Sequence, residues 1–288
     1  MKPHQKGILL TGTGVLLISP DAAFIRLIGV PAMDLLFWRG TMVGLVMCLV
    51  ILLRERGDLP AFIKRFSWAV VLAAAISVGL NFLFIVGITH TSAASALAIL
   101  AATPLFAAVI GRLFLGERLS WFTWTAALAV LALIAGIAGD ALAQSSGVGV
   151  VAALGASIAL AAYFTVFRVY PDISRLQVFA IAGAIGAMIA ATLGTPFDFT
   201  PRQMSLTLVL TVLIMPVSTV LMTMGPRYLP AAEVSLLILL ESVFGPLWVL
   251  FAVGEVPSPI TIACGAAILV TVGWHAVMTG RRERRAES

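Results

Sequence analysis

The sequence contains few of the residues that a water-soluble protein of its length needs. Of its 288 residues, only 11% are Asp, Glu, Lys or Arg, whereas 61% are hydrophobic and the mean hydropathy is +1.09. In soluble domains about a quarter of the residues are charged and about half are apolar. So little polar material cannot cover so much apolar surface. The composition therefore excludes a soluble enzyme, a nucleic-acid-binding protein and a disordered scaffold.

Cysteine and histidine are equally scarce. The two cysteines, Cys48 and Cys264, each lie inside an apolar run, which excludes a disulfide framework and a cysteine-rich metal site. The three histidines, His4, His90 and His275, form no HExxH motif, and no GxxxxGK[ST] nucleotide-binding loop occurs. We therefore expect no metal, no cofactor and no ATP hydrolysis by this chain.

Apolar stretches take up most of the chain, and many are about as long as a membrane is thick. A bilayer core of about 30 Å is crossed by a helix of about 20 apolar residues. Residues 66–111 contain no Asp, Glu, Lys or Arg, which is enough for two such helices. We predict an all-α integral membrane protein with ten transmembrane helices. The predicted spans are residues 7–28, 31–53, 67–88, 92–113, 121–138, 148–169, 175–194, 204–225, 230–252 and 259–279.

Basic residues are distributed unevenly between the two sides of the predicted membrane. If the N-terminus is cytoplasmic, 15 of the 18 Lys and Arg residues fall in inner segments, Arg202 falls in an outer loop, and Arg26 and Arg39 lie within spans. The positive-inside rule then predicts a bacterial-type cytoplasmic (inner) membrane protein with both termini in the cytoplasm. Lys2 and Lys6 before the first apolar stretch are also typical of a signal peptide, but the repeat described next requires that this helix is retained.

The two halves of the chain resemble each other. A shift of 138 residues places Ala93-Ala94 on Ala231-Ala232 and Gly116-Glu117 on Gly254-Glu255. Each half then contains five helices, and because five is odd, the second copy must enter the membrane from the opposite side. Such inverted repeats are typical of secondary transporters that bind substrate near the midplane. We predict repeats at residues 1–140 and 147–280, followed by a basic cytoplasmic tail at 281–288.

A family resemblance is carried by Thr91–Leu97, Thr103–Phe106 and Leu115–Ser120, and more loosely by Ala231–Glu233 and Val253–Ser258. These segments are similar to EamA-type transporters of the drug/metabolite transporter superfamily. The resemblance implies a secondary transporter that exports small metabolites, amino acids above all, by alternating access. It also implies a central cavity between the repeats, lined mainly by the first, third, fourth, sixth, eighth and ninth helices.

Two other functional classes stay open at this point: a channel or facilitator for a small polar solute, and a membrane enzyme. A channel would show no trans-stimulated exchange of substrate, and an enzyme would turn over a lipid or solute. The expected partners are a small-molecule substrate, namely an amino acid or related metabolite, and the lipid bilayer. We expect no nucleic-acid partner, and the oligomeric state stays open.

Ionisable residues at membrane depth are costly, so they mark candidate sites. Asp21 and Arg39 lie at one depth on consecutive antiparallel helices, so we predict an ion pair that either stabilises the structure or contributes to a gate. Glu241 lies at the centre of span 230–252, with no basic residue evident at its depth. Both a transport function and a structurally satisfied, protonated acid are compatible with this position.

Other residues are candidates because of their place in the repeat or in the implied cavity helices. Asn81, for example, falls on Thr219 in the second half. Interhelical packing is the alternative role for such residues. The residues that we expect in the substrate cavity are Asn81, Ser95, Thr103, Tyr163, Ser218, Thr219, Glu241 and Phe244.

Proline and glycine residues are expected to shape several spans. Proline removes a backbone donor and leaves an upstream carbonyl free, so it acts either as a hinge or as a static kink. Gly40 and Gly44 form a GxxxG motif, which favours close helix packing over a dimer interface here. The candidate hinges are Pro20, Pro104, Pro216 and Pro246.

Overall fold

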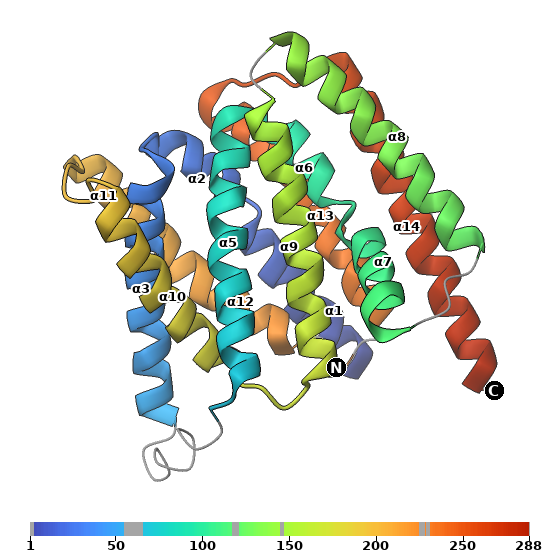
Figure 1. Ribbon diagram of the computed structural model, residues 1–288, viewed down its shortest axis with the longest axis horizontal. Coiled ribbons are helices and arrows are strands. Elements are labelled where there is room, and N and C mark those ends of the chain that lie inside the picture. The colour runs from blue at the N-terminus through green and yellow to red at the C-terminus, as the bar shows by residue number, and fades with distance from the viewer. Residues whose placement is uncertain are drawn as a thin grey trace.

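The computed structural model describes residues 3–54, 66–116, 121–144, 147–224, 228 and 231–287, and every regular element within these ranges is a helix (Figure 1). The first half contains α1 (Pro3–Ile18), α2 (Asp21–Ile28), α3 (Ala32–Arg54), α5 (Trp68–His90), α6 (Ala93–Leu100), α7 (Thr103–Leu115) and α8 (Trp121–Gln144). The second half contains α9 (Val148–Val169), α10 (Arg175–Leu193), α11 (Pro201–Leu208), the π-helix η1 (Val209–Ile214), α12 (Met215–Met224), α13 (Ala231–Val253) and α14 (Pro259–Glu287).

The helices have the length and composition of membrane spans. Within the described ranges, eight are long and apolar enough to cross a bilayer, and two shorter apolar helices occur at Leu237–Val253 and Pro259–His275. An all-helical integral membrane protein is therefore confirmed, whereas the number of ten spans stays a prediction. The tail predicted at 281–288 does not start a new segment, because α14 continues as far as Glu287.

Many large apolar side chains face outward, and some charged groups are buried inside the bundle alongside its apolar core. Phe114, Trp121 and Phe251 are each about four-fifths exposed (79, 80 and 79%). Asp21 and Arg39, by contrast, are only 5% and 4% exposed. This is the reverse of a soluble protein, and it is expected where the solvent is lipid, because lipid tails are as apolar as leucine side chains.

Three predicted spans are interrupted rather than continuous. Ser19-Pro20 separates α1 from α2, and Ala101-Ala102 separates α6 from α7, whose first turn contains Pro104. The π-helix η1 lies between α11 and α12 and ends two residues before Pro216. Pro246, however, lies inside the continuous helix α13. Three of the four candidate hinges therefore lie at or next to a break in α-helical geometry, and one does not.

Helices of the two halves pack in pairs: α3 along α10, α5 along α9, α1 along α12, and α8 along α14. In Figure 1, α8 and α14 flank the side of the bundle away from α3 and α10. The α3–α10 contact is close because glycines meet in it. A methyl carbon added at Gly40 would lie 2.8 Å from the carbonyl oxygen of Gly183, and one added at Gly44 would lie 3.4 Å from the Cα of Gly183. Close packing by the GxxxG motif is confirmed.

Helix boundaries recur at the spacing of the sequence repeat. Helix α6 starts at Ala93 and α13 at Ala231, while α8 starts at Trp121 and α14 at Pro259. Gly116 after α7 and Gly254 after α13 have φ angles of 68° and 70°, the left-handed region in which glycine commonly ends a helix. One difference breaks the correspondence, since α6 and α7 are separate whereas α13 is continuous.

Candidate substrate pathway

A buried ion pair joins α2 to α3. Arg39 Nη1 donates to Asp21 Oδ1 at 2.7 Å and Nη2 donates to Asp21 Oδ2 at 3.0 Å, and the two side chains are 4% and 7% exposed. The break at Pro20 makes Asp21 the first residue of α2, where the helix dipole favours a negative charge. The ion pair that we predicted from the sequence is therefore present, whereas its role in a gate stays a prediction.

The guanidinium of Arg39 also faces a small cavity of about 50 Å³ between α3, α5, α10 and α12. Its Nη2 lies 3.5 Å from Oδ1 of Asn81, at the limit of a hydrogen bond, and Asn81 in turn donates to the carbonyl of Ser77 at 2.9 Å. Thr219, which the repeat pairs with Asn81, lines the same cavity. The buried Nε of Arg39 has no partner in the part of the chain that the structure describes.

Glu241 lies in α13, which packs against α1, α2, α6 and α14. Its neighbour Ser242 donates to the carbonyl of Leu97 at 3.2 Å, which holds this level of α13 against α6. Asp21 lies close enough to Glu241 for their like charges to interact. Glu241 has no hydrogen bond or ion pair to any residue of the described ranges. The Arg39 guanidinium pairs with Asp21 alone, so the group of Asp21, Arg39 and Glu241 has an unbalanced negative charge whenever Glu241 is ionised.

Other predicted cavity residues hold helices together. Thr103 donates to the carbonyl of Leu100 at 2.6 Å and shares a hydrogen bond of 3.0 Å with Ser157 of α9, so it spans the break between α6 and α7. Ser218 donates within its own helix to Met215 at 3.0 Å. Neither Thr103 nor Ser218 lines the small cavity.

The two aromatic candidates do not line the small cavity either. Tyr163 packs in an apolar cluster with residues of α5 and α10, and its ring centroid lies 4.8 Å from that of Phe167. Phe244 is half-buried in α13. The predicted cavity residues are therefore not gathered in one space: Asn81 and Thr219 share the small cavity, and Ser95 lies in a separate pocket.

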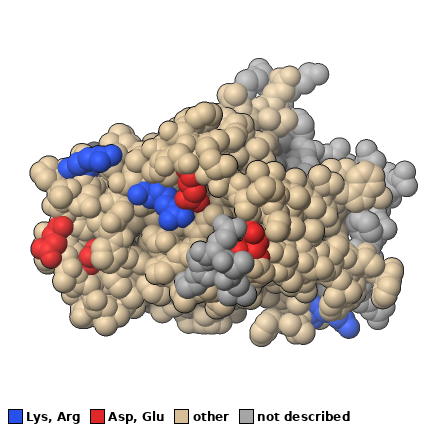
Figure 2. Space-filling model, turned by 90° about the horizontal axis from the view of Figure 1, so that it is seen from above, with Lys and Arg blue, Asp and Glu red and all other residues tan. Residues whose placement is uncertain are grey.

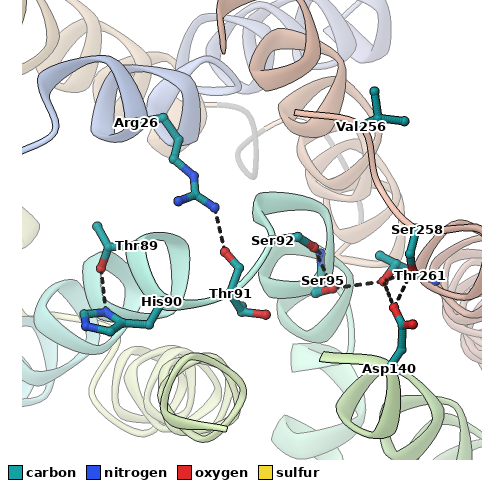
Figure 3. Close-up of a pocket in the computed structure, with 10 residues that line it drawn as sticks. All are labelled: Arg26, Thr89, His90, Thr91, Ser92, Ser95, Asp140, Val256, Ser258 and Thr261. Atoms are coloured by element: carbon teal, nitrogen blue, oxygen red, sulfur yellow. Dashed lines mark hydrogen bonds between the residues drawn. The ribbon is translucent and has the colours of Figure 1, made fainter. Parts of the chain in front are cut away.

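That separate pocket, of about 290 Å³, opens at the end of the bundle opposite the two termini (Figures 1 and 3). We call it the far-end pocket. Its walls come from the end of α2, the turn between α5 and α6, the end of α8 and the start of α14. Figure 2, seen from this end, shows few charged side chains, with a basic and an acidic group in contact.

A chain of hydroxyl groups crosses one side of the far-end pocket. Ser92 donates to Ser95 at 2.7 Å, and Ser95 shares a hydrogen bond of 3.0 Å with Thr261 of α14. Asp140, at the end of α8, accepts from Ser258, which lies just before α14, and lies 3.5 Å from Thr261 (Figure 3). Hydroxyls from α6 and α14 thus meet a carboxylate from α8.

An ion pair spans the other side. Arg26 Nη2 donates to the carbonyl oxygen of Thr91 at 2.7 Å and lies 2.9 Å from Glu255 Oε2. The second carboxylate oxygen of Glu255 accepts from the backbone N–H of Ala93 at 2.7 Å. We call these contacts the clasp. It joins α2 and the α5–α6 turn of the first half to the loop between α13 and α14 of the second.

The far-end pocket was not predicted from the sequence, although some signals were present. The Gly-Glu pair of the repeat marks Glu255, although the repeat alone does not indicate a pocket there. Its counterpart Glu117 lies outside the described residues. Ser258 and Thr261 continue the repeat, and Asp140 is an acidic residue in the last turns of α8.

Comparisons with known proteins agree with this architecture. A solved structure described as "Crystal structure of protein" matches with a TM-score of 0.67 and 21% sequence identity, over 97% of this chain and 99% of that one. At this identity the likeness establishes a shared fold. A search of curated proteins found no match. The model of the EamA-like transporter family matches residues 5–139. This segment therefore belongs to the EamA-like transporter family, within the drug/metabolite transporter superfamily, as the sequence resemblance indicated.

Proposed function

We propose that the protein is a secondary transporter that exports small metabolites, amino acids above all, by alternating access between two inverted repeats. Membership of its first half in a transporter family supports the transport of a small solute across the bilayer. The proposed repeats are residues 1–140 and 147–280. The proposed site is the cluster of Asp21, Arg39, Asn81 and Glu241, which we call the midplane cluster because Glu241 lies at the centre of its predicted span.

The pattern of helix packing supports an inverted repeat. An exchange of the two halves turns the α5–α9 contact into the contact between α12 and α1, and it leaves the α3–α10 and α8–α14 contacts unchanged. These pairs are what a pseudo-two-fold axis in the membrane plane requires, and carriers of this kind bind substrate where the repeats meet. The cluster lies at such a position, because α2, α3 and α5 of the first half meet α12 and α13 of the second there.

The observation that carries the proposal is the charge of the cluster. Buried charges in a membrane protein are costly and mark substrate or ion pathways. Arg39 and Asp21 neutralise each other, and Glu241 is left without a described basic partner. The ammonium group of an amino acid, or a proton, would balance Glu241, while the unpartnered Nε of Arg39 is a donor for a carboxylate. A zwitterion carries both of these groups, which is why we propose an amino acid as the solute.

Counterflow in proteoliposomes tests this function. Vesicles that contain the purified protein and are loaded with unlabelled amino acids should accumulate the labelled form of its substrate, because a carrier exchanges across the membrane and a channel does not. Glu241→Gln should fold but lose most of the exchange, or lose its dependence on pH. Asp198→Asn, which neutralises an exposed carboxylate, is the control and should exchange at the wild-type rate. Wild-type exchange with an unaltered pH profile in Glu241→Gln would contradict the assignment.

We also propose a cytoplasmic-membrane location with both termini in the cytoplasm. The uneven distribution of basic residues supports this orientation. Because the far-end pocket is opposite the termini, it would then open to the outside, where an exported solute leaves the protein.

A further inference from the structure

The far-end pocket contains two buried polar atoms without hydrogen-bond partners in the described chain. They are the hydroxyl oxygen of Thr91, a residue that is 5% exposed, and Nε of Arg26. Both residues line the pocket. A buried polar group that lacks a partner costs free energy, and in native proteins it needs a specific explanation. A ligand that accepts hydrogen bonds in the pocket would supply the missing partner to both.

The opposite wall has the complementary character. Asp140 lies across the pocket from Arg26 (Figure 3), beside the hydroxyls of Ser258 and Thr261. A carboxylate and hydroxyl oxygens accept hydrogen bonds from an ammonium or hydroxyl group. At about 290 Å³, the pocket is at or below the lower limit of typical drug-sized sites, which suits a solute of few atoms.

We propose that the far-end pocket is a second solute-binding site, separate from the midplane cluster, and that it binds a small zwitterion. Arg26 and Thr91 bind the anionic group of the solute, and the Asp140 wall binds its cationic group. The choice of a transported solute as ligand rests on the proposed function, whereas the pocket and its unpartnered atoms do not.

The clasp makes binding at this site competitive with an internal contact. Arg26 already pairs with Glu255, so the carboxylate of a solute and that of Glu255 compete for one guanidinium. Removing the charge of Glu255 should therefore increase affinity for the solute, although Glu255 lies beside the site. A purely structural role of the clasp predicts no such increase.

Equilibrium binding of labelled L-alanine to the purified full-length chain tests the proposal. The wild type should show two binding components. Thr91→Val should weaken one of them, Glu241→Gln should lose the other, and the double variant should show both effects. Thr91→Val removes a hydroxyl that has no partner in the described chain, so it should leave folding intact and weaken the pocket component roughly fivefold to tenfold. Glu255→Gln should strengthen the pocket component, and Thr192→Val, which makes the same change as Thr91→Val at an exposed position of α10 outside the pocket, is the matched control and should leave both components unchanged.

Competition with propionate and with ethylamine defines the ligand class. Each carries one of the two charges of alanine, so each should displace it from the pocket more weakly than unlabelled alanine does. If Thr91→Val binds both components with wild-type affinity, or the wild type lacks a second one, the pocket proposal is wrong. If Glu241→Gln retains both components, the midplane assignment under the proposed function fails instead, and the pocket proposal stands.

Discussion

Replacing Arg39 by methionine removes a guanidinium that is buried against a carboxylate, and its surroundings set the cost. The pair is bidentate at 2.7 and 3.0 Å, with side chains 4% and 7% exposed. Methionine leaves Asp21 buried without its guanidinium partner and close to a second carboxyl group, that of Glu241. Removing one partner of a buried pair costs about 3–5 kcal/mol. The ratio of folded to unfolded protein should therefore fall by about two to four powers of ten.

Two further variants separate the ion pair from general effects of the substitution. Arg202→Met makes the same change at an exposed arginine and should alter the free energy of unfolding by about 0.5 kcal/mol or less. Asp21→Asn combined with Arg39→Met removes both charges, so neither is left buried without a partner. It should therefore be more stable than Arg39→Met alone, because most of the loss in that variant comes from the uncompensated carboxylate.

Unfolding of the purified protein in mixed micelles, with increasing SDS and tryptophan fluorescence as the signal, measures these differences. The wild type, Asp21→Asn, Arg39→Met and the double variant form a double-mutant cycle that isolates the coupling of Asp21 and Arg39. Unfolding of Arg39→Met within about 1 kcal/mol of the wild type would refute a strongly coupled buried pair. The coupling would also be refuted if the losses of unfolding free energy in the two single variants add up to the loss in the double variant.

Three other predictions follow from packing and topology. Gly183→Ala should destabilise the protein by about 1–3 kcal/mol, because the added methyl carbon would lie 2.8 Å from the Cα of Gly44. Gly186→Ala is the control: its methyl carbon would make only ordinary contacts, so this variant should unfold like the wild type in the SDS assay. Pro104→Ala should slow counterflow more than Pro246→Ala, because only Pro104 lies beside a break between helices; equal rates would make both static features. A single cysteine placed at Arg282 should react with an impermeant reagent only after the cells are permeabilised. Labelling in intact cells would contradict the cytoplasmic location of the C-terminus.

Much of the helical fold could be predicted because hydrophobicity over about 20 residues encodes a span directly. The span predicted at 148–169 coincides with α9, and the one at 230–252 differs from α13 by a single residue at each end. Breaks within spans were harder to predict. Pro104 lies beside one, whereas Pro246 lies inside a continuous helix, because neighbouring groups in a bundle can compensate for a missing backbone donor.

The candidate sites divide in the same way. The Asp21–Arg39 pair could be predicted because an unpaired charge inside the membrane is costly, so opposite charges at one membrane depth pair with each other. The far-end pocket could not, because its residues lie near helix ends, where sequence alone suggests contact with water. Its clasp joins Ala93 to Glu255, 162 positions away in the chain, and no local pattern encodes such a contact.

Helix α2 connects the two sites physically. Asp21 is its first residue and Arg26 lies in its last turn, about 7.5 Å further along the axis at 1.5 Å per residue. The helix is bounded by Pro20 and by Gly29, whose φ of 60° ends it in the left-handed conformation, so its eight residues form a short helix between two breaks in the helical backbone. A solute that draws Arg26 away from Glu255 therefore acts on the carboxylate that holds Arg39. We expect binding in the far-end pocket to alter the midplane cluster through this helix.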